Sequence, residues 1–223
     1  MMSDAYIFSS RQLKTLLIGK GYKKIVGLNL KTEELGYNQS ALALNELVKT
    51  GAVYTEDETF LMSEDVREII TVLGNAEKFD VIRTKKDKLS DICCYRAHKL
   101  MMVRNIQANK DWYSFSFLSL EDFYELLLDD GYLPDDNVDD LFYDDELEEF
   151  ENPIVFDPLS TIGETVPVLF SLDISVNTDS HKYMRIMDYY FFRYIVVSDG
   201  EEEKRYAYSR KKFKEVFLSL MER

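Results

Sequence analysis

The sequence predicts an α+β fold in which two related halves form one large antiparallel sheet flanked by helices. The first observation behind this prediction is a short strand followed by a capped amphipathic helix, which occurs near the start of the chain and again 110 residues later. The second is a series of short segments in which apolar and polar residues alternate, as in half-buried strands. We therefore expect a single compact pseudo-two-fold domain over residues 1–223, with repeated halves over about 5–114 and 115–223.

The first strand–helix unit lies at the start of the chain. Residues 6–8 alternate like a strand, and Ser9 stands at the expected N-cap of the helix. Gly21 and Tyr22 follow where a helix commonly ends. The apolar positions at helical spacing are Leu13, Leu16 and Leu17. The pattern predicts a helix that begins after Ser9 and ends near Gly21.

The second unit, Phe115 to Tyr132, repeats this order without a gap. Ser119 and Gly131 stand in it where Ser9 and Gly21 stand in the first unit. A third copy near residue 223 has the residues Tyr206, Tyr208, Ser209, Phe213, Val216 and Phe217. Chance recurrence of a capped helix after a strand is the alternative explanation, and duplication is the preferred one.

Residues 38–73 predict a helical hairpin interrupted by two short strands. The first helix is expected to end at Gly51, and Ser63 caps the second. Strand segments at 52–54 and 60–62 flank a polar turn. The apolar residues at helical spacing are Leu42, Leu44, Leu47 and Val48 in the first helix, and Val66, Ile69, Ile70 and Leu73 on the buried face of the second.

This order of a helix, a glycine and two short strands also describes part of a winged helix. A wing that reads DNA needs Lys or Arg near the phosphates, and residues 38–73 contain only Lys49 and Arg67. The acids in the same segment are Glu46, Glu56, Asp57, Glu58, Glu64, Asp65 and Glu68. DNA reading by this segment is therefore disfavoured.

Period-two alternation predicts two series of strands, one in each half. They are Phe79–Arg83, Asp91–Ala97, Leu100–Ile106 and Tyr113–Phe117, followed by Val168–Val176, Tyr183–Asp188, Tyr190–Val197 and Lys204–Tyr208. Short polar turns separate the strands of each series, and Asp199-Gly200 is typical of a hairpin turn. Short connections favour antiparallel pairing, so each series predicts a meander.

The composition limits the classes of function. With 27 Lys and Arg against 41 Asp and Glu the net charge is −14, which repels nucleic acid and anionic membrane surfaces. No secretory signal or membrane-spanning stretch is evident, so we expect a cytoplasmic protein. The two cysteines, Cys93 and Cys94, are adjacent and would point to opposite faces of a strand, which indicates neither a disulfide framework nor a metal site.

Catalytic and cofactor motifs are absent from the sequence. The two histidines, His98 and His181, each stand alone, and no glycine-rich phosphate loop occurs. The acidic pairs Asp135-Asp136, Asp139-Asp140 and Asp144-Asp145 lack the ligand spacing of a calcium loop. We therefore expect no catalytic residue, no cofactor and no metal, and a protein that is not an enzyme.

The segment Asp129–Glu151 is dense in Asp and Glu with interspersed apolar residues. A charge run of this kind usually solvates a surface or a loop. Alternatively, Leu141, Phe142, Leu147 and Phe150 place a short helix on the body of the protein, and the acids then face a basic partner.

The order of these features resembles the EspG family, the cytosolic chaperones of type VII (ESX) secretion. The resemblance rests on residues 9–13 (SSRQL) continuing to Gly21-Tyr22, on residues 41–53 (ALALNELVKTGAV) and on residues 118–127 (LSLEDFYELL). It covers about the first 130 residues. The second half follows the family in its order of elements but departs from it in the long acidic insertion.

The resemblance implies a non-enzymatic adaptor that binds the tip of a helical secretion substrate before export. The composition favours clients of the WXG100-like or LXG-like kind, while the oligomeric state stays open. By order of elements the family's client-binding loop corresponds to residues 84–90, with Lys85, Lys86 and Lys88 as candidate partner-binding residues. The alternative functions are an acidic immunity protein that neutralises a basic toxin and, below it, a degenerate winged-helix regulator.

Overall fold

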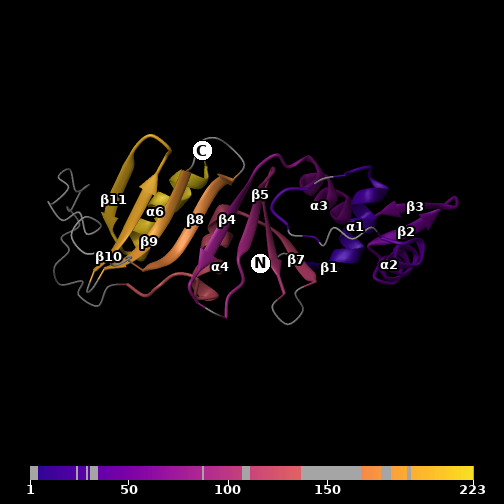
Figure 1. The fold of residues 1–223 in the computed structure, drawn as a ribbon, viewed down its shortest axis with the longest axis horizontal. Helices are drawn as coiled ribbons and strands as arrows, with labels where there is room; N and C mark the ends of the chain where they lie inside the picture. The colour runs from indigo at the N-terminus through magenta and orange to yellow at the C-terminus, as the bar shows by residue number, and fades with distance from the viewer. Residues whose placement is uncertain are drawn as a thin grey trace. The chain divides into compact units, whose positions relative to one another are not determined.

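The computed structural model describes residues 5–23, 25–28, 30, 35–86, 88–106, 111–136, 167–176, 182–189 and 192–222 (Figure 1). Its helices are α1 (Ser10–Gly19), α2 (Tyr37–Lys49), α3 (Glu64–Asn75), α4 (Leu120–Asp129) and α6 (Arg210–Met221). Its strands are β1 (Tyr6–Ser9), β2 (Val53–Glu56), β3 (Thr59–Met62), β4 (Phe79–Thr84), β5 (Ile92–Arg96), β6 (Leu100–Asn105), β7 (Trp112–Leu118), β8 (Val168–Val176), β9 (Lys182–Tyr189), β10 (Phe192–Ser198) and β11 (Glu203–Ala207).

The fold is α+β, as the sequence predicts. A nine-stranded antiparallel sheet has the order β1-β7-β6-β5-β4-β8-β9-β10-β11, and β2 and β3 form a separate two-stranded sheet. Every predicted strand is present, with bounds that differ by no more than a few residues. Their antiparallel pairing is confirmed for β5 through β7 and for β8 through β11.

The chain divides into two compact units that do not follow a single cut in the sequence. The first unit is Met1–Phe79 with Ser90–Leu118, and the second is Asp80–Leu89 with Ser119–Arg223. The boundary after Leu118 lies close to the expected junction of the two halves. Repetition of the halves as whole structures and their union in one domain stay predictions.

The three strand–helix units begin with the same local structure. Ser9, Ser119 and Ser209 each have extended backbone geometry at the N-cap, and each hydroxyl oxygen accepts the backbone N–H three residues later. At α1 the cap is reciprocal, because the Ser9 N–H donates to Oε1 of Gln12 at 2.8 Å. The predicted helix starts are therefore confirmed by their hydrogen bonds.

The helices of the first two strand–helix units, α1 and α4, also end alike. Gly21 and Gly131 have φ angles of 80° and 77°, in the left-handed region that favours glycine. The next backbone N–H turns back onto the helix, from Tyr22 to the Leu17 carbonyl at 3.0 Å and from Tyr132 to the Leu127 carbonyl at 2.9 Å. These bonds define a Schellman motif at the end of α1 and of α4. The predicted Gly-Tyr helix end is confirmed in both places.

The core of the first unit lies between the helices α1 and α3 and one face of its strands. Leu13, Leu16 and Leu17 of α1 meet Phe8 and Phe115 of the strands in this core. All four predicted apolar residues of α3 have no exposed surface, namely Val66, Ile69, Ile70 and Leu73. Periodicity therefore identified the buried face of α3 correctly.

On α2 the pattern is less informative. Leu47 is fully buried, but Leu42 and Val48 are 54% and 38% exposed. The predicted apolar residues of α2 all have helical spacing. This spacing indicates a helix, but it does not show which side of the helix another element covers. Ala43, which faces the core beside Leu47, is the second buried residue of this helix.

The core of the second unit is aromatic. Phe213 and Phe217 of α6 stack with ring centroids 5.7 Å apart, and Phe213 meets Phe170 of β8 edge-on at 5.3 Å. Phe123 of α4 packs against Phe217 at 6.0 Å. Figure 1 shows α6 lying along one face of β8, β9 and β10. The apolar faces predicted for α4 and α6 thus pack together.

We predict that Gly21→Ala lowers the free energy of unfolding by about 1 kcal/mol, because an alanine Cβ is strained at a φ of 80°. Gly19 is the matched control, since it is the last residue of α1 and a Cβ there meets no atom within 4 Å. Gly19→Ala should raise stability by several tenths of a kcal/mol. Urea unfolding monitored by circular dichroism measures both variants, and equal effects would contradict the assignment.

Candidate functional site

The predicted partner-binding lysines follow β4 in the second unit, and all three are exposed. Lys86 is engaged within the protein, because its ammonium group donates to the Gly131 carbonyl oxygen and lies 3.5 Å from that of Leu133. A cation at these carbonyls stabilises the C-terminal end of α4. Lys85 and Lys88 are the lysines of this loop whose side chains face solvent, and their binding role stays a prediction.

Only the beginning of the acidic segment falls within the described residues. The carboxylate of Asp136 accepts the backbone N–H of Arg210 at 2.6 Å, at the first turn of α6. The Arg210 guanidinium pairs with Asp135 at 2.8 Å, and Arg193 donates to the Asp135 carbonyl at 2.6 Å. These acids therefore anchor the segment to α6. The later acids Asp139, Asp140, Asp144 and Asp145, and the predicted short helix, lie outside the described residues.

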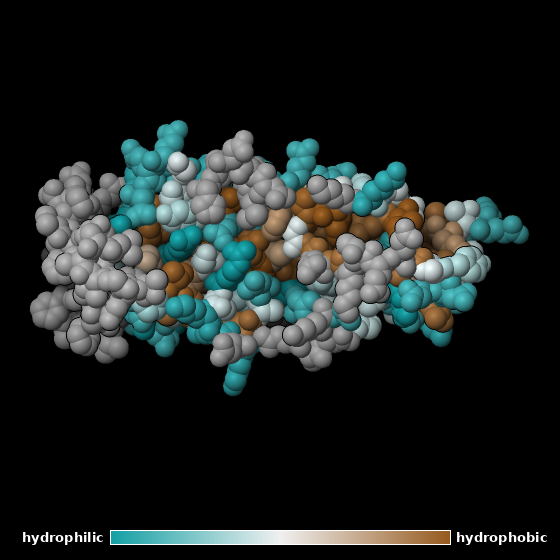
Figure 2. Space-filling model, viewed as in Figure 1, coloured by the Kyte–Doolittle hydropathy of each residue, from teal (hydrophilic) through white to brown (hydrophobic). Residues whose placement is uncertain are grey.

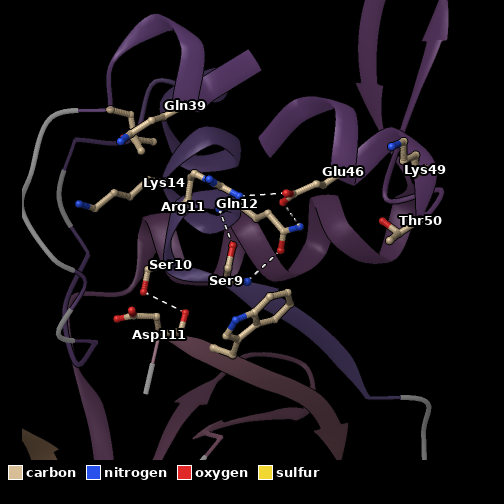
Figure 3. A pocket seen from close by; sticks show the side chains of 12 residues that line it. Ser9, Ser10, Arg11, Gln12, Lys14, Gln39, Glu46, Lys49, Thr50 and Asp111 are labelled. Atoms are coloured by element: carbon tan, nitrogen blue, oxygen red, sulfur yellow. Dashed lines mark hydrogen bonds and ion pairs between the residues drawn. The ribbon is translucent and has the colours of Figure 1, made fainter. Parts of the chain in front are cut away.

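A pocket of about 560 Å³ lies in the first unit beside the start of α1 (Figure 3). Glu46 of α2 is among the residues that line it. This carboxylate accepts the Arg11 guanidinium at 2.9 Å and the side-chain N–H of Gln12 at 3.2 Å. Since Gln12 also completes the cap at Ser9, one polar network connects the start of α1 with α2. Sequence reasoning did not predict this pocket, because the partners are more than 30 residues apart.

The chemistry of this pocket indicates a structural polar network. Its lining contains no histidine or cysteine to act as a base or nucleophile. The Ser10 hydroxyl donates to the Asp111 backbone carbonyl oxygen at 3.2 Å. The Glu46 carboxylate accepts two donors from α1 and so links that helix to α2.

The histidine and cysteine side chains that the structure describes are also dispersed. His98 lies 3.2 Å from Glu68 and stacks on Phe117. Cys94 is buried, and the Cys93 thiol contacts the Gly27 carbonyl at 3.2 Å. His181 lies outside the described residues. Within the described part of the chain no three His, Cys, Asp or Glu side chains gather as metal ligands.

The most unusual surface of the first unit is apolar. Five large hydrophobic side chains on α2 and the following hairpin are exposed, and we call them the α2–hairpin surface. They are Tyr37 (88% exposed), Leu42 (54%), Val48 (38%), Tyr54 (44%) and Phe60 (53%). Figure 2 shows hydrophobic surface along the β2–β3 hairpin and hydrophilic surface at its tip. The α2–hairpin surface is thus a set of exposed apolar residues on neighbouring elements and not one flat patch. Large exposed apolar groups are typical of protein-binding surfaces.

The tip of the β2–β3 hairpin is a two-residue turn. Asp57 and Glu58 have φ angles of 48° and 61°, as a type I′ turn requires. With Glu56 they place three consecutive acids at the end of the hairpin. The sequence predicted a polar turn here, but the exposure of Tyr54 and Phe60 depends on the hairpin standing apart from the large sheet.

Comparison with known proteins finds no relative of this chain among protein families or curated proteins. No family model matches the chain, and no curated protein matches it significantly. In the described residues no helix is long and apolar enough to cross a membrane.

We predict that Glu46→Ala lowers the free energy of unfolding by about 1 kcal/mol, because it removes the acceptor for Arg11 and Gln12 together. Glu46→Gln is the matched control, since its amide oxygen still accepts a hydrogen bond. This variant should lose less free energy of unfolding than Glu46→Ala. Urea unfolding at pH 7 measures both. A loss as large for the glutamine variant would show that charge, and not the acceptor, holds α1 to α2.

Tyr208 gives a pH-dependent prediction. Burial raises its pKa well above the ordinary value, and its hydroxyl donates to the Pro134 carbonyl at 2.9 Å. Because the folded state retains this proton, the stabilisation is present below about pH 10, the unfolded tyrosine pKa, and is lost as the pH rises above it.

Tyr208→Phe should therefore be less stable than wild type at pH 8 by about 1 kcal/mol and should lose less stability between pH 9 and about 11. The measurement is urea unfolding at several pH values. Parallel pH curves for the two proteins would contradict the assignment to Tyr208.

Proposed function

We propose that this chain is a non-enzymatic cytoplasmic adaptor that binds a helical type VII secretion substrate, of the WXG100-like or LXG-like kind, before its export. The observation that carries the proposal is the α2–hairpin surface, where Tyr37, Tyr54 and Phe60 are exposed together with aliphatic side chains. The EspG-like order of elements supplies the class of client. A chaperone that shields an apolar helical tip needs an apolar surface of its own.

The energetics fit this role. Burial of apolar surface contributes about 25 cal/mol per Å², and aromatic side chains commonly dominate binding energy at interfaces. Tyr54 and Phe60 project from a hairpin outside the large sheet, so a partner can cover them without disturbing the main core. The part of the affinity that comes from such burial depends little on salt.

The described residues give less support to the immunity alternative. That function would use the acidic segment to attract a basic toxin, and its affinity would fall steeply with salt. Asp135 and Asp136 are the described acids of this segment that follow Asp130, and both already bind Arg210 at the start of α6. Their charge is thus partly used within the protein. The adaptor remains the preferred function.

We expect Tyr54→Ser with Phe60→Ser to lower the affinity for the client at least tenfold, because two apolar anchors are lost. Ile18→Ser is the matched control, since Ile18 is 64% exposed on α1 and outside the α2–hairpin surface. The client is captured from the host lysate, identified by mass spectrometry, produced in purified form and measured by calorimetry.

The same titration at 0.1 M and about 1 M salt separates the alternatives, because the Debye length falls from about 10 to about 3 Å. Binding of a WXG100-like or LXG-like protein that persists at both salts supports the adaptor. Release of a basic toxin at high salt would overturn it in favour of immunity. Lys85→Ala with Lys88→Ala tests the loop after β4, and unchanged affinity would remove that loop from the binding surface.

A further inference from the structure

The β2–β3 hairpin presents aromatic residues on both of its faces. Tyr54 pairs with Leu61 and Thr55 with Phe60 in the antiparallel register. Side chains of successive cross-strand pairs point to opposite faces, so Tyr54 and Phe60 lie on opposite sides of the ribbon. Both are about half exposed. A flat partner surface would cover only one of them.

The second central residue of this hairpin's turn does not suit it. Both central positions of a type I′ turn have positive φ, for which Asn-Gly is strongly favoured. Here Asp57 and Glu58 occupy these positions, and glutamate has no special tolerance for a φ of 61°. Backbone strain of this kind is often retained where a side chain has a function. The side chains retained here are carboxylates.

We propose that the hairpin is an insertion element which crosses an apolar cleft between two helices of the partner, so that its acidic tip reaches Lys or Arg at the far rim of the cleft. This proposal rests on the proposed function and specifies how the client is recognised. The opposite placement of Tyr54 and Phe60 requires a cleft with two walls. The acids Glu56, Asp57 and Glu58 at the tip require basic residues where the tip arrives.

The two parts of the hairpin then act on different steps of binding. The acidic tip attracts the basic rim and raises the association rate, an effect that salt screens. The aromatic residues are desolvated in the cleft and slow dissociation. Charge and apolar contact can therefore be separated by kinetics, even though they lie on one hairpin.

The decisive variant is Asp57→Asn with Glu58→Gly, which installs the preferred turn and removes two charges. It should raise the melting temperature, because the turn strain is relieved, and should slow association about tenfold at 0.1 M salt. The control Asp57→Asn with Glu58→Gln removes the same charges and keeps a side chain at the strained position. It should slow association equally without raising the melting temperature.

The partner surface is identified by photo-crosslinking in host cells, with a benzophenone amino acid at position 54, 60 or 18 of the full chain. We expect positions 54 and 60 to crosslink to two different helices of one protein, in apolar peptides flanked by Lys or Arg, and position 18 to give no crosslink to it. Association rates are then measured with that purified protein.

Several results would overturn the insertion element. They are crosslinks from only one of positions 54 and 60, crosslinks to a second copy of this chain, peptides without basic flanks, or no crosslink. An unchanged association rate in both charge variants would do the same. If Tyr54→Ser with Phe60→Ser still abolishes binding in that case, the adaptor function stands and only the charged insertion fails. If that variant also binds normally, both proposals fail.

Discussion

The Gly-Tyr helix end is the local constraint on which the first unit depends. Gly21 reverses the chain after α1, and the Schellman bond then fixes the backbone of Tyr22. The Tyr22 ring lies over Gly74 of α3, where an added Cβ would be only 2.4 Å from the ring. A glycine at the end of one helix and a glycine within another therefore set how closely α1 and α3 approach.

The second unit uses the same helix end for a different contact. After α4, Gly131 again reverses the chain, but its carbonyl accepts the ammonium group of Lys86. The following residues reach Arg210 and Tyr208, where Pro134 and Asp136 supply acceptors. One local motif thus leads to apolar packing in the first unit and to polar anchoring in the second. The backbone geometry of the helix end is the same in both places, and its surroundings differ.

Local features were predictable because they depend on neighbours in the sequence. The caps at Ser9, Ser119 and Ser209, the two Gly-Tyr ends and the strands follow from hydrogen-bond geometry within a few residues. Features that depend on contacts between distant elements could not be predicted from the sequence. The exposure of Leu42 and Phe60, and the network of Arg11 with Glu46, follow from which element covers which face. Periodicity carries no information about that choice, so the α2–hairpin surface could not be recognised from the sequence.

The two units are interleaved along the chain, because Asp80–Leu89 belongs to the second unit while Ser90–Leu118 returns to the first. During synthesis, β4 leaves the ribosome before the strands and helices of its own unit exist. The first unit, in turn, lacks β7 until residue 118 has emerged. Neither unit corresponds to a continuous gene fragment. A recombination event that exchanged one unit would have to insert at two places, which favours inheritance of the two units together.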